Sequence, residues 1–262
     1  MMTLLEVDRL SFHYPGREVL HEISLALEPR KFYGLLGANG SGKTTLLDLM
    51  IGNLRPTTGG VFLRDKPLTS YPRRKLAREM ALIPQEFRAG FDFSVFEVVL
   101  MGRHPYIPRF GAPDEDDLAI VQEAMEAIGV AELADRPVTA LSGGEKQRVI
   151  AARALAQNTP LLIMDEATAN LDVLHTRQIF NVVKKRVKKQ SVTVIAAIHN
   201  LNQAAAFCDE IFLLKDGKIF ARGPAEDILV PEKIFDVFGV RCRTGWNEFS
   251  GSHQVSLQWK MS

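Results

Sequence analysis

The chain has 262 residues, of which 46% are hydrophobic and 24% are charged, and its formal net charge is +1. This length predicts one or two domains, and the composition is typical of a globular protein and excludes global disorder. The balance of 32 basic and 31 acidic residues argues against a dedicated nucleic-acid-binding protein. Two cysteines, Cys208 and Cys242, are too few for a disulfide scaffold, and they form no CxxC pair, so a structural zinc site is disfavoured.

The beginning of the chain, residues 1–8, lacks the basic region and apolar stretch of a signal peptide. No uncharged apolar run of about 18 residues occurs along the sequence. We therefore expect a chain that works in a reducing cytosol and does not cross a membrane by itself. It could still act at a membrane surface.

The elements expected in chain order follow from the hydrophobic pattern. Apolar alternation over the first thirty residues predicts an antiparallel β-rich start with a turn at Pro15–Gly16. Short apolar runs predict buried strands at 31–36, 80–84, 161–164 and 192–198. Helix signals occur at 44–54, 114–128, 142–158 and around 179–187. Asp216–Gly217 predicts a hairpin, and strands that alternate with helices indicate an α/β fold.

A glycine-rich loop follows the predicted strand at 31–36 and precedes a predicted helix. It fits the pattern GxxxxGK[ST] with Gly37, Ala38, Asn39, Gly40, Ser41, Gly42, Lys43 and Thr44. Glycines let backbone N–H groups surround phosphates, Lys43 can reach the β- and γ-phosphates, and the Thr44 hydroxyl can bind Mg²⁺. Thr45 is a further candidate nucleotide-binding residue. A chance glycine-rich turn is disfavoured by the strand–loop–helix order.

Two carboxylates, Asp165 and Glu166, end the apolar run at 161–164. The carboxyl end of a buried parallel strand faces the ligand crevice of such a sheet. Asp165 is placed to hold Mg²⁺, and Glu166, one residue on, is placed to act as general base toward a water molecule. The alternative, a solvated acidic strand end, is weakened by the phosphate loop in the same chain.

A second anion-binding helix start is expected at residues 141–148, which read LSGGEKQR. Ser142 is a plausible N-cap, and Gly143 and Gly144 expose backbone N–H groups. With this motif, residues 4–240 resemble the nucleotide-binding subunits of ATP-binding-cassette (ABC) transporters. The resemblance implies a P-loop NTPase (RecA-like) core with an N-terminal antiparallel β flank and an inserted helical subdomain. On this basis we expect a single domain at 1–240, its core at 1–87 and 159–240, its helical subdomain at 88–158, and a tail of unknown role at 241–262.

The resemblance also implies a head-to-tail homodimer that holds two ATP molecules with Mg²⁺. Ser142, Gly143 and Gly144 would face the γ-phosphate of ATP bound by the other subunit. By motif match, Gln85 would contact Mg²⁺ or the attacking water, and His199 would contact the γ-phosphate. Asp172 belongs to the stretch Asn170–Asp172, which would cross between the subunits. Tyr14 would stack on adenine. Three of these residues have a plainer interpretation as well: Gln85 as a loop residue, His199 as a structural histidine, and Tyr14 as a core partner of Phe12.

Three segments are similar to importers of metal chelates within that family: a GRxP segment within 98–106, an LDxxH stretch ending at His175, and residues 135–140. Ala167 departs from the proline that is usual in importers. Apolar residues between 91 and 110 (Phe93, Val95, Phe96 and Tyr106) could contact a membrane permease or belong to the core. The basic run at 184–189 could bind nucleic acid or acidic lipid, but its place at a helix end favours a solvated C-terminus.

The resemblance thus implies an ATPase subunit that powers uptake of an iron-siderophore, heme, cobalamin or similar chelate. Its expected partners are permease subunits in the membrane and an external substrate-binding protein, without nucleic acid. Its expected place is the cytoplasmic face of the inner membrane, as a peripheral subunit. The alternatives are a soluble ATPase of the same family, for example in cluster assembly, and a nucleotide-binding regulatory protein without turnover.

Overall fold

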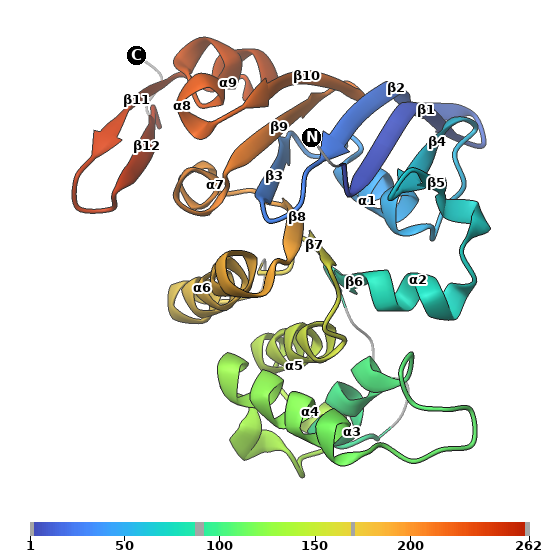
Figure 1. Ribbon diagram of the computed structural model, residues 1–262. Coiled ribbons are helices and arrows are strands. Elements are labelled where there is room, and N and C mark those ends of the chain that lie inside the picture. Colours follow the sequence, from blue (N-terminus) through green and yellow to red (C-terminus); the bar gives the residue numbers. More distant parts are fainter. Residues whose placement is uncertain (1–2, 87–91, 169–170, 260–262) are drawn as a thin grey trace. The chain divides into compact units, whose positions relative to one another are not determined.

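The computed structural model describes residues 3–86, 92–168 and 171–259. The chain divides into two compact units, the first formed by Met1–Ser70 and Thr193–Ser262, and the second by Tyr71–Val192 (Figure 1). Within the described ranges no helix combines the length and the apolar character needed to span a membrane.

The first unit contains an antiparallel sheet that matches the predicted β-rich start. Its strands, in the order β2-β1-β4-β5, are β1 (Leu5–Tyr14), β2 (Arg17–Leu27), β4 (Thr58–Leu63) and β5 (Lys66–Pro67). The inward residues of β1, such as Leu5, Val7 and Leu10, are almost fully buried, while their neighbours are partly or fully exposed. This alternation is typical of a sheet with one solvated face.

The parallel strands of the first unit carry the phosphate loop. β3 (Phe32–Gly37) pairs in parallel with β8 (Thr193–Ala197) on one side and with β9 (Glu210–Lys215) on the other. β9 turns into β10 (Lys218–Gly223) as the predicted hairpin. All residues of β3 and β8 are buried, as continuous apolar strands of a parallel sheet require. The helices of this unit are α1 (Lys43–Ile51), α7 (Leu201–Phe207), α8 (Ala225–Ile228) and α9 (Pro231–Phe238).

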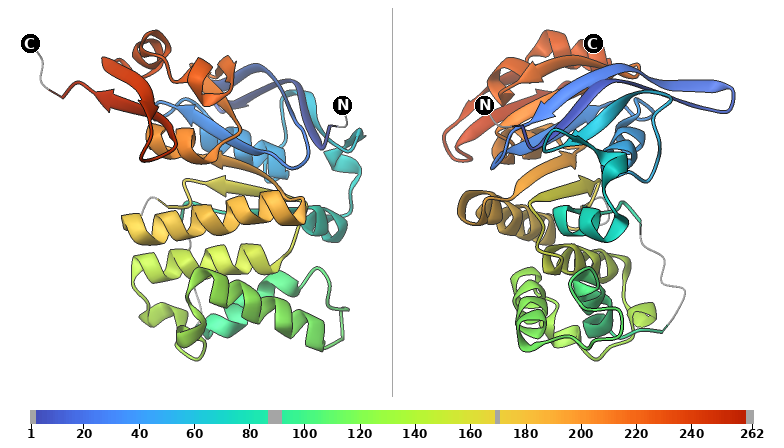
Figure 2. Two further views of the ribbon diagram at one scale, coloured as in Figure 1. Left: turned by 60° about the vertical axis from the view of Figure 1, so that its left-hand side comes forward. Right: turned by 45° about the vertical axis from the view of Figure 1, so that its right-hand side comes forward.

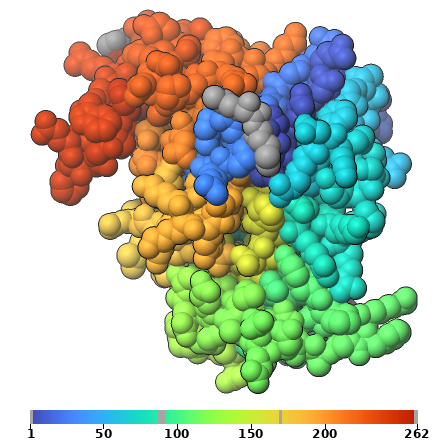
Figure 3. All heavy atoms as spheres, viewed as in Figure 1, coloured from blue at the N-terminus to red at the C-terminus, as the bar shows by residue number. Residues whose placement is uncertain are grey.

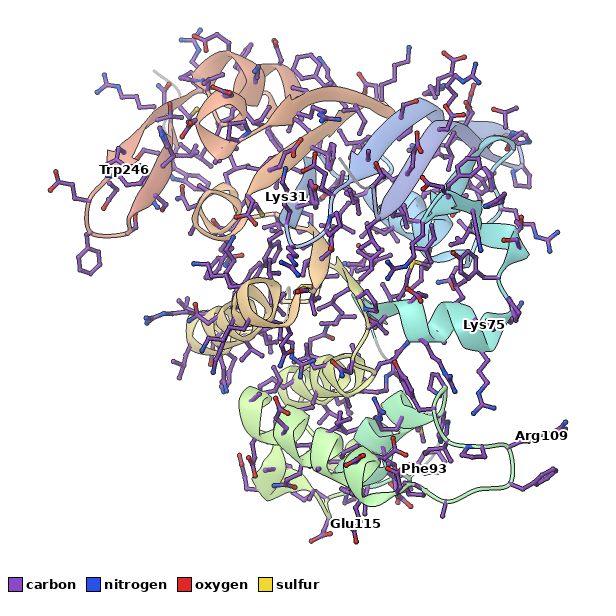
Figure 4. The ribbon with its side chains drawn as sticks, in the orientation of Figure 1. Lys31, Lys75, Phe93, Arg109, Glu115 and Trp246 are labelled. Atoms are coloured by element: carbon purple, nitrogen blue, oxygen red, sulfur yellow. The ribbon has the colours of Figure 1, made fainter. Side chains whose placement is uncertain are left out.

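The C-terminal tail, to which the sequence assigns no structure, forms a hairpin of β11 (Cys242–Asn247) and β12 (Ser252–Leu257). Two-stranded hairpins are marginally stable alone, so this one needs support from the rest of its unit. The Asn202 side chain of α7 supplies it, because its Oδ1 accepts a bond of 2.7 Å from the backbone N–H of Val255. Figure 3 shows the hairpin projecting from its unit. Trp246, on β11 of this hairpin, is labelled in Figure 4.

The second unit combines two parallel strands with helices. The strands are β6 (Met80–Ile83) and β7 (Leu161–Asp165), and the helices are α2 (Arg73–Glu79), α3 (Val95–Leu100), α4 (Glu115–Ile128), α5 (Gly143–Ala156) and α6 (Val173–Gln190). In Figure 2, α5 runs between α6 and the pair α3–α4. Asp114 and Ser142 begin α4 and α5 with capping boxes, so both predicted starts are confirmed.

Helix ends differ slightly from the expected ones. α1 stops at Ile51 because Gly52 adopts a left-handed conformation with φ of 82° and terminates the helix, three residues before the predicted end. α5 stops at Ala156, two residues early. The proposed limits of the helical subdomain remain predictions, and residue 88 lies outside the described residues.

Candidate functional site

The phosphate loop is built by backbone conformation. β3 ends at Gly37 and α1 begins at Lys43, with Gly40 and Gly42 at φ values of 77° and 105° between them. These are values that glycine adopts without steric cost. The first turn of α1 carries no acidic residue, so the positive end of the helix dipole is not neutralised there. The predicted order of strand, loop and helix is present, and a helix start of this kind suits an anion.

Lys43 and Ser41 are the buried polar side chains of this loop. Lys43 is only 5% exposed. Its Nζ donates to the carbonyl oxygens of Gly37 at 2.9 Å and Ala38 at 3.2 Å. Ser41 Oγ is buried and has no hydrogen-bond partner among the described residues. A buried hydroxyl without a partner is costly unless a ligand completes it. The loop thus fits a phosphate group.

The remaining loop residues differ in exposure. Asn39, Gly40 and Thr44 are exposed, whereas Thr45 is buried. Thr44 can therefore offer its hydroxyl to a bound ligand or ion, and Thr45 contributes to the packing of α1.

Tyr14 and His199 also belong to the first unit. The rings of Tyr14 and Phe12 contact each other edge-on, with their centroids 4.9 Å apart. Tyr14 is nevertheless 43% exposed, whereas Phe12 is 9% exposed. Tyr14 is therefore not a core residue in the way that Phe12 is. His199 is exposed and lies two residues beyond Ala197, which pairs with Leu35 of β3. Parallel strands end at a common edge, so His199 and Gly37 leave the sheet at the same edge.

In the second unit, Gln85 and Glu166 are brought together by strand register. Ile83 of β6 pairs with Met164 of β7. Gln85 lies two residues after Ile83, and Glu166 lies two residues after Met164. Gln85 Nε2 donates to Glu166 Oε2 at 2.8 Å. Glu166 has a φ of 46°, a strained value for a non-glycine residue that is common at functional sites. Asp165 is only 6% exposed whereas Glu166 is half-buried, so the adjacent carboxylates have different environments.

The signature segment forms a regular helix start. Ser142 Oγ donates to Glu145 Oε2 at 2.7 Å, and the backbone N–H of Glu145 donates back to Ser142 Oγ at 3.3 Å. The hydrogen bonds from the Ser142 side chain and backbone lower the pKa of Glu145. A Cβ added to Gly143 would meet no atom within 4 Å in the part of the chain that the structure describes, and the φ of Gly143 is not positive. Neither packing nor backbone strain inside the chain explains glycine there.

Gln147 is a residue of this region that the sequence reasoning did not select. It is 4% exposed, and its Nε2 donates to the carbonyl oxygens of Pro84 at 3.0 Å and Ala167 at 2.9 Å. A signal was present, because residue 147 shares a helix face with the apolar Ile150, Ala151 and Ala154. A polar side chain on a buried face needs partners.

Asp172 caps α6 and is held by His175. Its Oδ1 accepts from the backbone N–H of His175 at 2.8 Å and lies 2.9 Å from His175 Nδ1. These contacts, the backbone hydrogen bond first, lower the pKa of Asp172. The next residues, Val173 and Leu174, are 84% and 69% exposed. Asn170, expected in the same loop, lies outside the described residues.

The two ambiguous surface segments separate into core and exposed residues. Val95 is fully buried and belongs to the core, whereas Phe93 is 40% exposed and is labelled in Figure 4. Within the basic run, Arg186 is buried and donates to the carbonyl oxygen of Leu155 at 2.7 Å. The run occupies the last turns of α6, in agreement with the helix-end interpretation.

The structure thus groups the predicted residues by unit. The first unit holds Tyr14, the phosphate loop and His199; the second holds Gln85, the signature residues, Asp165, Glu166 and Asp172. Oxygen donors such as Asp165 and Thr44 are the kind that Mg²⁺ prefers.

Comparisons with known proteins extend these observations. The family model described as "ABC transporter" matches residues 20–169. The cobalamin import ATP-binding protein BtuD of Halobacterium salinarum is 38% identical over 252 residues, which cover 96% of this chain and 63% of that protein. The hemin import ATP-binding protein HmuV of Bordetella pertussis is 39% identical over 247 residues, covering 90% of this chain and 92% of that protein.

Among solved structures, one of an inward-facing ABC transporter, provisionally described as of the metal-chelate type, matches with a TM-score of 0.82 and 28% identity. The match covers 98% of this chain and 97% of that chain. The predicted fold, an α/β phosphate-loop core with an antiparallel flank and a helical segment, is thereby confirmed. The chain spans less than two thirds of the length of the Halobacterium relative.

Proposed function

We propose, from the premise that this chain belongs to the ABC transporter family, that it hydrolyses ATP to power import of a metal chelate through a separate permease. The observation that carries the catalytic part is the contact between Gln85 and Glu166. It places the Gln85 amide beside the carboxylate of Glu166, a residue that has a strained backbone and directly follows a buried aspartate. This arrangement suits a hydrolytic reaction better than nucleotide binding alone.

The residues have separable tasks in the proposed reaction. Lys43 and the N–H groups of the phosphate loop bind the phosphates, and Thr44 and Asp165 would hold Mg²⁺, which neutralises phosphate charge when bound. Glu166 orients a water molecule, held also by Gln85, and accepts its proton as the water oxygen bonds to the γ-phosphorus. The bond from the γ-phosphorus to the bridging oxygen breaks, which leaves ADP and phosphate. His199 donates a hydrogen bond to the γ-phosphate.

We further propose that two copies of this chain assemble head to tail. Gly143 supports this arrangement, because a Cβ built there meets no atom of the described residues within 4 Å. Space at a helix start with free N–H groups suits the approach of an anion held by another molecule. The exposed Val173 and Leu174, next to Asp172, are apolar surface that a second copy would cover.

The transported compound is proposed from the relatives. The printed names of the Halobacterium and Bordetella proteins refer to import of cobalamin and hemin, and both are large metal chelates. The GRxP segment points in the same direction. We place this chain as a peripheral subunit at the cytoplasmic face of the inner membrane, with permease subunits and an external substrate-binding protein as partners.

A pull-down tests the transporter assignment. The tagged Glu166→Gln variant is incubated with ATP and detergent-solubilised membranes of the source organism, and the bound proteins are identified by mass spectrometry. A permease in stoichiometric amount is the expected result, and the Lys43→Ala variant serves as a control that should retain less of it. Recovery of soluble partners alone would favour a soluble ATPase of the family and overturn the import proposal.

A further inference from the structure

We infer that Gln147 is a positioning residue that holds the Gln85–Glu166 pair in place from the signature helix. The inference rests on the proposed hydrolysis at Glu166 and adds a residue that controls its geometry. Gln147 does not touch the reacting groups. It acts through the two backbone positions that flank them.

The contacts of the Gln147 amide define this role. Its Nε2 bonds the carbonyl oxygen of Pro84, the residue before Gln85, and the carbonyl oxygen of Ala167, the residue after Glu166. One amide group, with its two N–H donors, therefore joins the loop after β6 to the loop after β7. Gln147 is only 4% exposed; its bond to Ala167 is buried and its bond to Pro84 is partly buried. Loss of the donors would leave two carbonyl oxygens in a poorly hydrated region without these partners.

The strain at Glu166 makes such support necessary. A non-glycine residue with a φ of 46° stays in that conformation only when its surroundings hold it there. The carbonyl of Ala167 is the first backbone acceptor past Glu166, and Gln147 binds it. When that bond is lost, we expect the loop to relax and the Glu166 carboxylate to move away from Gln85.

The place of Gln147 on α5 adds a link to the signature. Gln147 lies two residues after Glu145, which closes the capping box at Ser142. The helix that presents Gly143 and Gly144 to an anion is thus the helix that positions Glu166. In the proposed dimer, a phosphate of the partner's nucleotide would meet the start of the same helix.

The chain offers a matched control at the other end of α5. Gln157 Nε2 donates at 2.9 Å to the carbonyl oxygen of Met80, which begins β6, and also to the carbonyl oxygen of Ala77 in α2. Gln147 and Gln157 therefore make the same kind of contact, amide to backbone carbonyl, at opposite ends of one strand. Gln147 binds the backbone just after the end of β6, next to Gln85. Gln157 binds the backbone at the beginning of β6, away from Gln85.

The test compares Gln147→Met with Gln157→Met in the full-length chain, since methionine keeps the length of glutamine without its donors. ATP turnover, affinity for a non-hydrolysable ATP analogue, Tm and hydrogen exchange are measured for both. We expect Gln147→Met to lower kcat by about ten- to a hundredfold, the cost of a misplaced catalytic group, with KM changed less than about threefold. The two variants should lower Tm by similar amounts, because each loses the same kind of hydrogen bonds. Gln157→Met should keep kcat within about twofold of the parent.

Hydrogen exchange separates the inference from the proposed function. Exchange in the peptide 161–168 should increase in Gln147→Met and not in Gln157→Met, whether or not the parent hydrolyses ATP. Equal losses of kcat in the two variants, or unchanged exchange in that peptide, would overturn the positioning role. A parent chain that hydrolyses ATP no faster than Glu166→Gln would instead contradict the proposed function, and the exchange result would still decide the role of Gln147.

Discussion

The phosphate loop and the carboxylate region are built in different ways. The loop is one continuous segment in which backbone conformation makes the site, and Lys43 is anchored to carbonyls only five and six residues away. The carboxylate region joins three segments that are far apart in sequence, at residues 84–85, 147 and 165–167. Side-chain amides connect these segments.

This difference has consequences for how each region fails. A locally built loop keeps its shape when one side chain changes, so its variants should lose ligand binding and little else. A region assembled by side chains should lose catalytic geometry while it still binds nucleotide. The following predictions separate the two regions, beginning with the largest expected effect.

Removal of the Glu166 charge should stop the reaction and spare binding. Glu166→Gln is expected to lower kcat by about 10²- to 10⁴-fold, the usual contribution of a general base. Affinity for ATP should stay within about threefold, because the phosphate loop is unchanged. Steady-state ATPase assays and equilibrium binding measure both quantities, with Glu126→Gln on α4 as a control. Turnover at the parental rate in Glu166→Gln would contradict its assignment as base.

A buried ion pair in the second unit should govern stability without governing chemistry. Arg103 Nε lies 2.8 Å from Asp117 Oδ1, and both side chains are less than 10% exposed. Asp117→Ala leaves a buried guanidinium without this partner and should lower the free energy of unfolding by about 3–5 kcal/mol. The double variant Arg103→Met, Asp117→Ala should recover part of the loss in denaturant titrations. A single variant as stable as the parent would contradict the prediction.

Loss of the Lys43 ammonium should weaken nucleotide binding selectively. Lys43→Ala removes a charged donor to the phosphates, worth about 1.5–3 kcal/mol, so the Kd for ATP should rise by about ten- to a hundredfold. Lys75, which is exposed on α2 and labelled in Figure 4, gives the control Lys75→Ala. Isothermal titration with ATP measures both. An unchanged Kd for Lys43→Ala would mean that the loop does not bind the phosphates.

The cap of the signature helix should show a pH-dependent contribution. Ser142 lowers the pKa of Glu145 below its ordinary value of 4.5, so the folded state binds fewer protons there than the unfolded state. Its stabilisation is present above that value and is lost as the pH falls through the lowered pKa. Glu145→Ala should therefore reduce Tm by about 2–4 °C at pH 7 and by less in acid. A Tm difference that grows on acidification would contradict this sign.

The sequence predicts those parts of the molecule whose signals are local. The phosphate loop, the Ser142 cap and the hairpin at Asp216–Gly217 each depend on a few consecutive residues, and the structure has the conformation expected of each. The pairing of Gln85 with Glu166 depends on the register of β6 and β7, and these strands are buried almost throughout, so they lack the alternation of apolar and polar residues that sets a register. The roles of the site residues remain predictions.

Other features needed tertiary information. Gln147 lies inside a quoted motif, yet its partners belong to two other segments, and only folding brings them within reach. The tail hairpin was missed because β11 is polar and largely exposed, and because the support of the hairpin comes from Asn202 on a different element. Val95 and Phe93 look alike in sequence, and their burial differs because of the helices around them.

Complementation between two defective chains tests the central claim most directly. Lys43→Ala disables the phosphate loop and keeps the signature, whereas Gly143→Tyr blocks the signature and keeps the loop. A Cβ built on Gly143 meets no atom of the described residues within 4 Å, so the backbone there accepts a side chain. A head-to-tail dimer predicts that a mixture of the two chains hydrolyses ATP clearly faster than the sum of the separate chains, because each mixed dimer has one complete site. A mixture no faster than that sum would contradict the account.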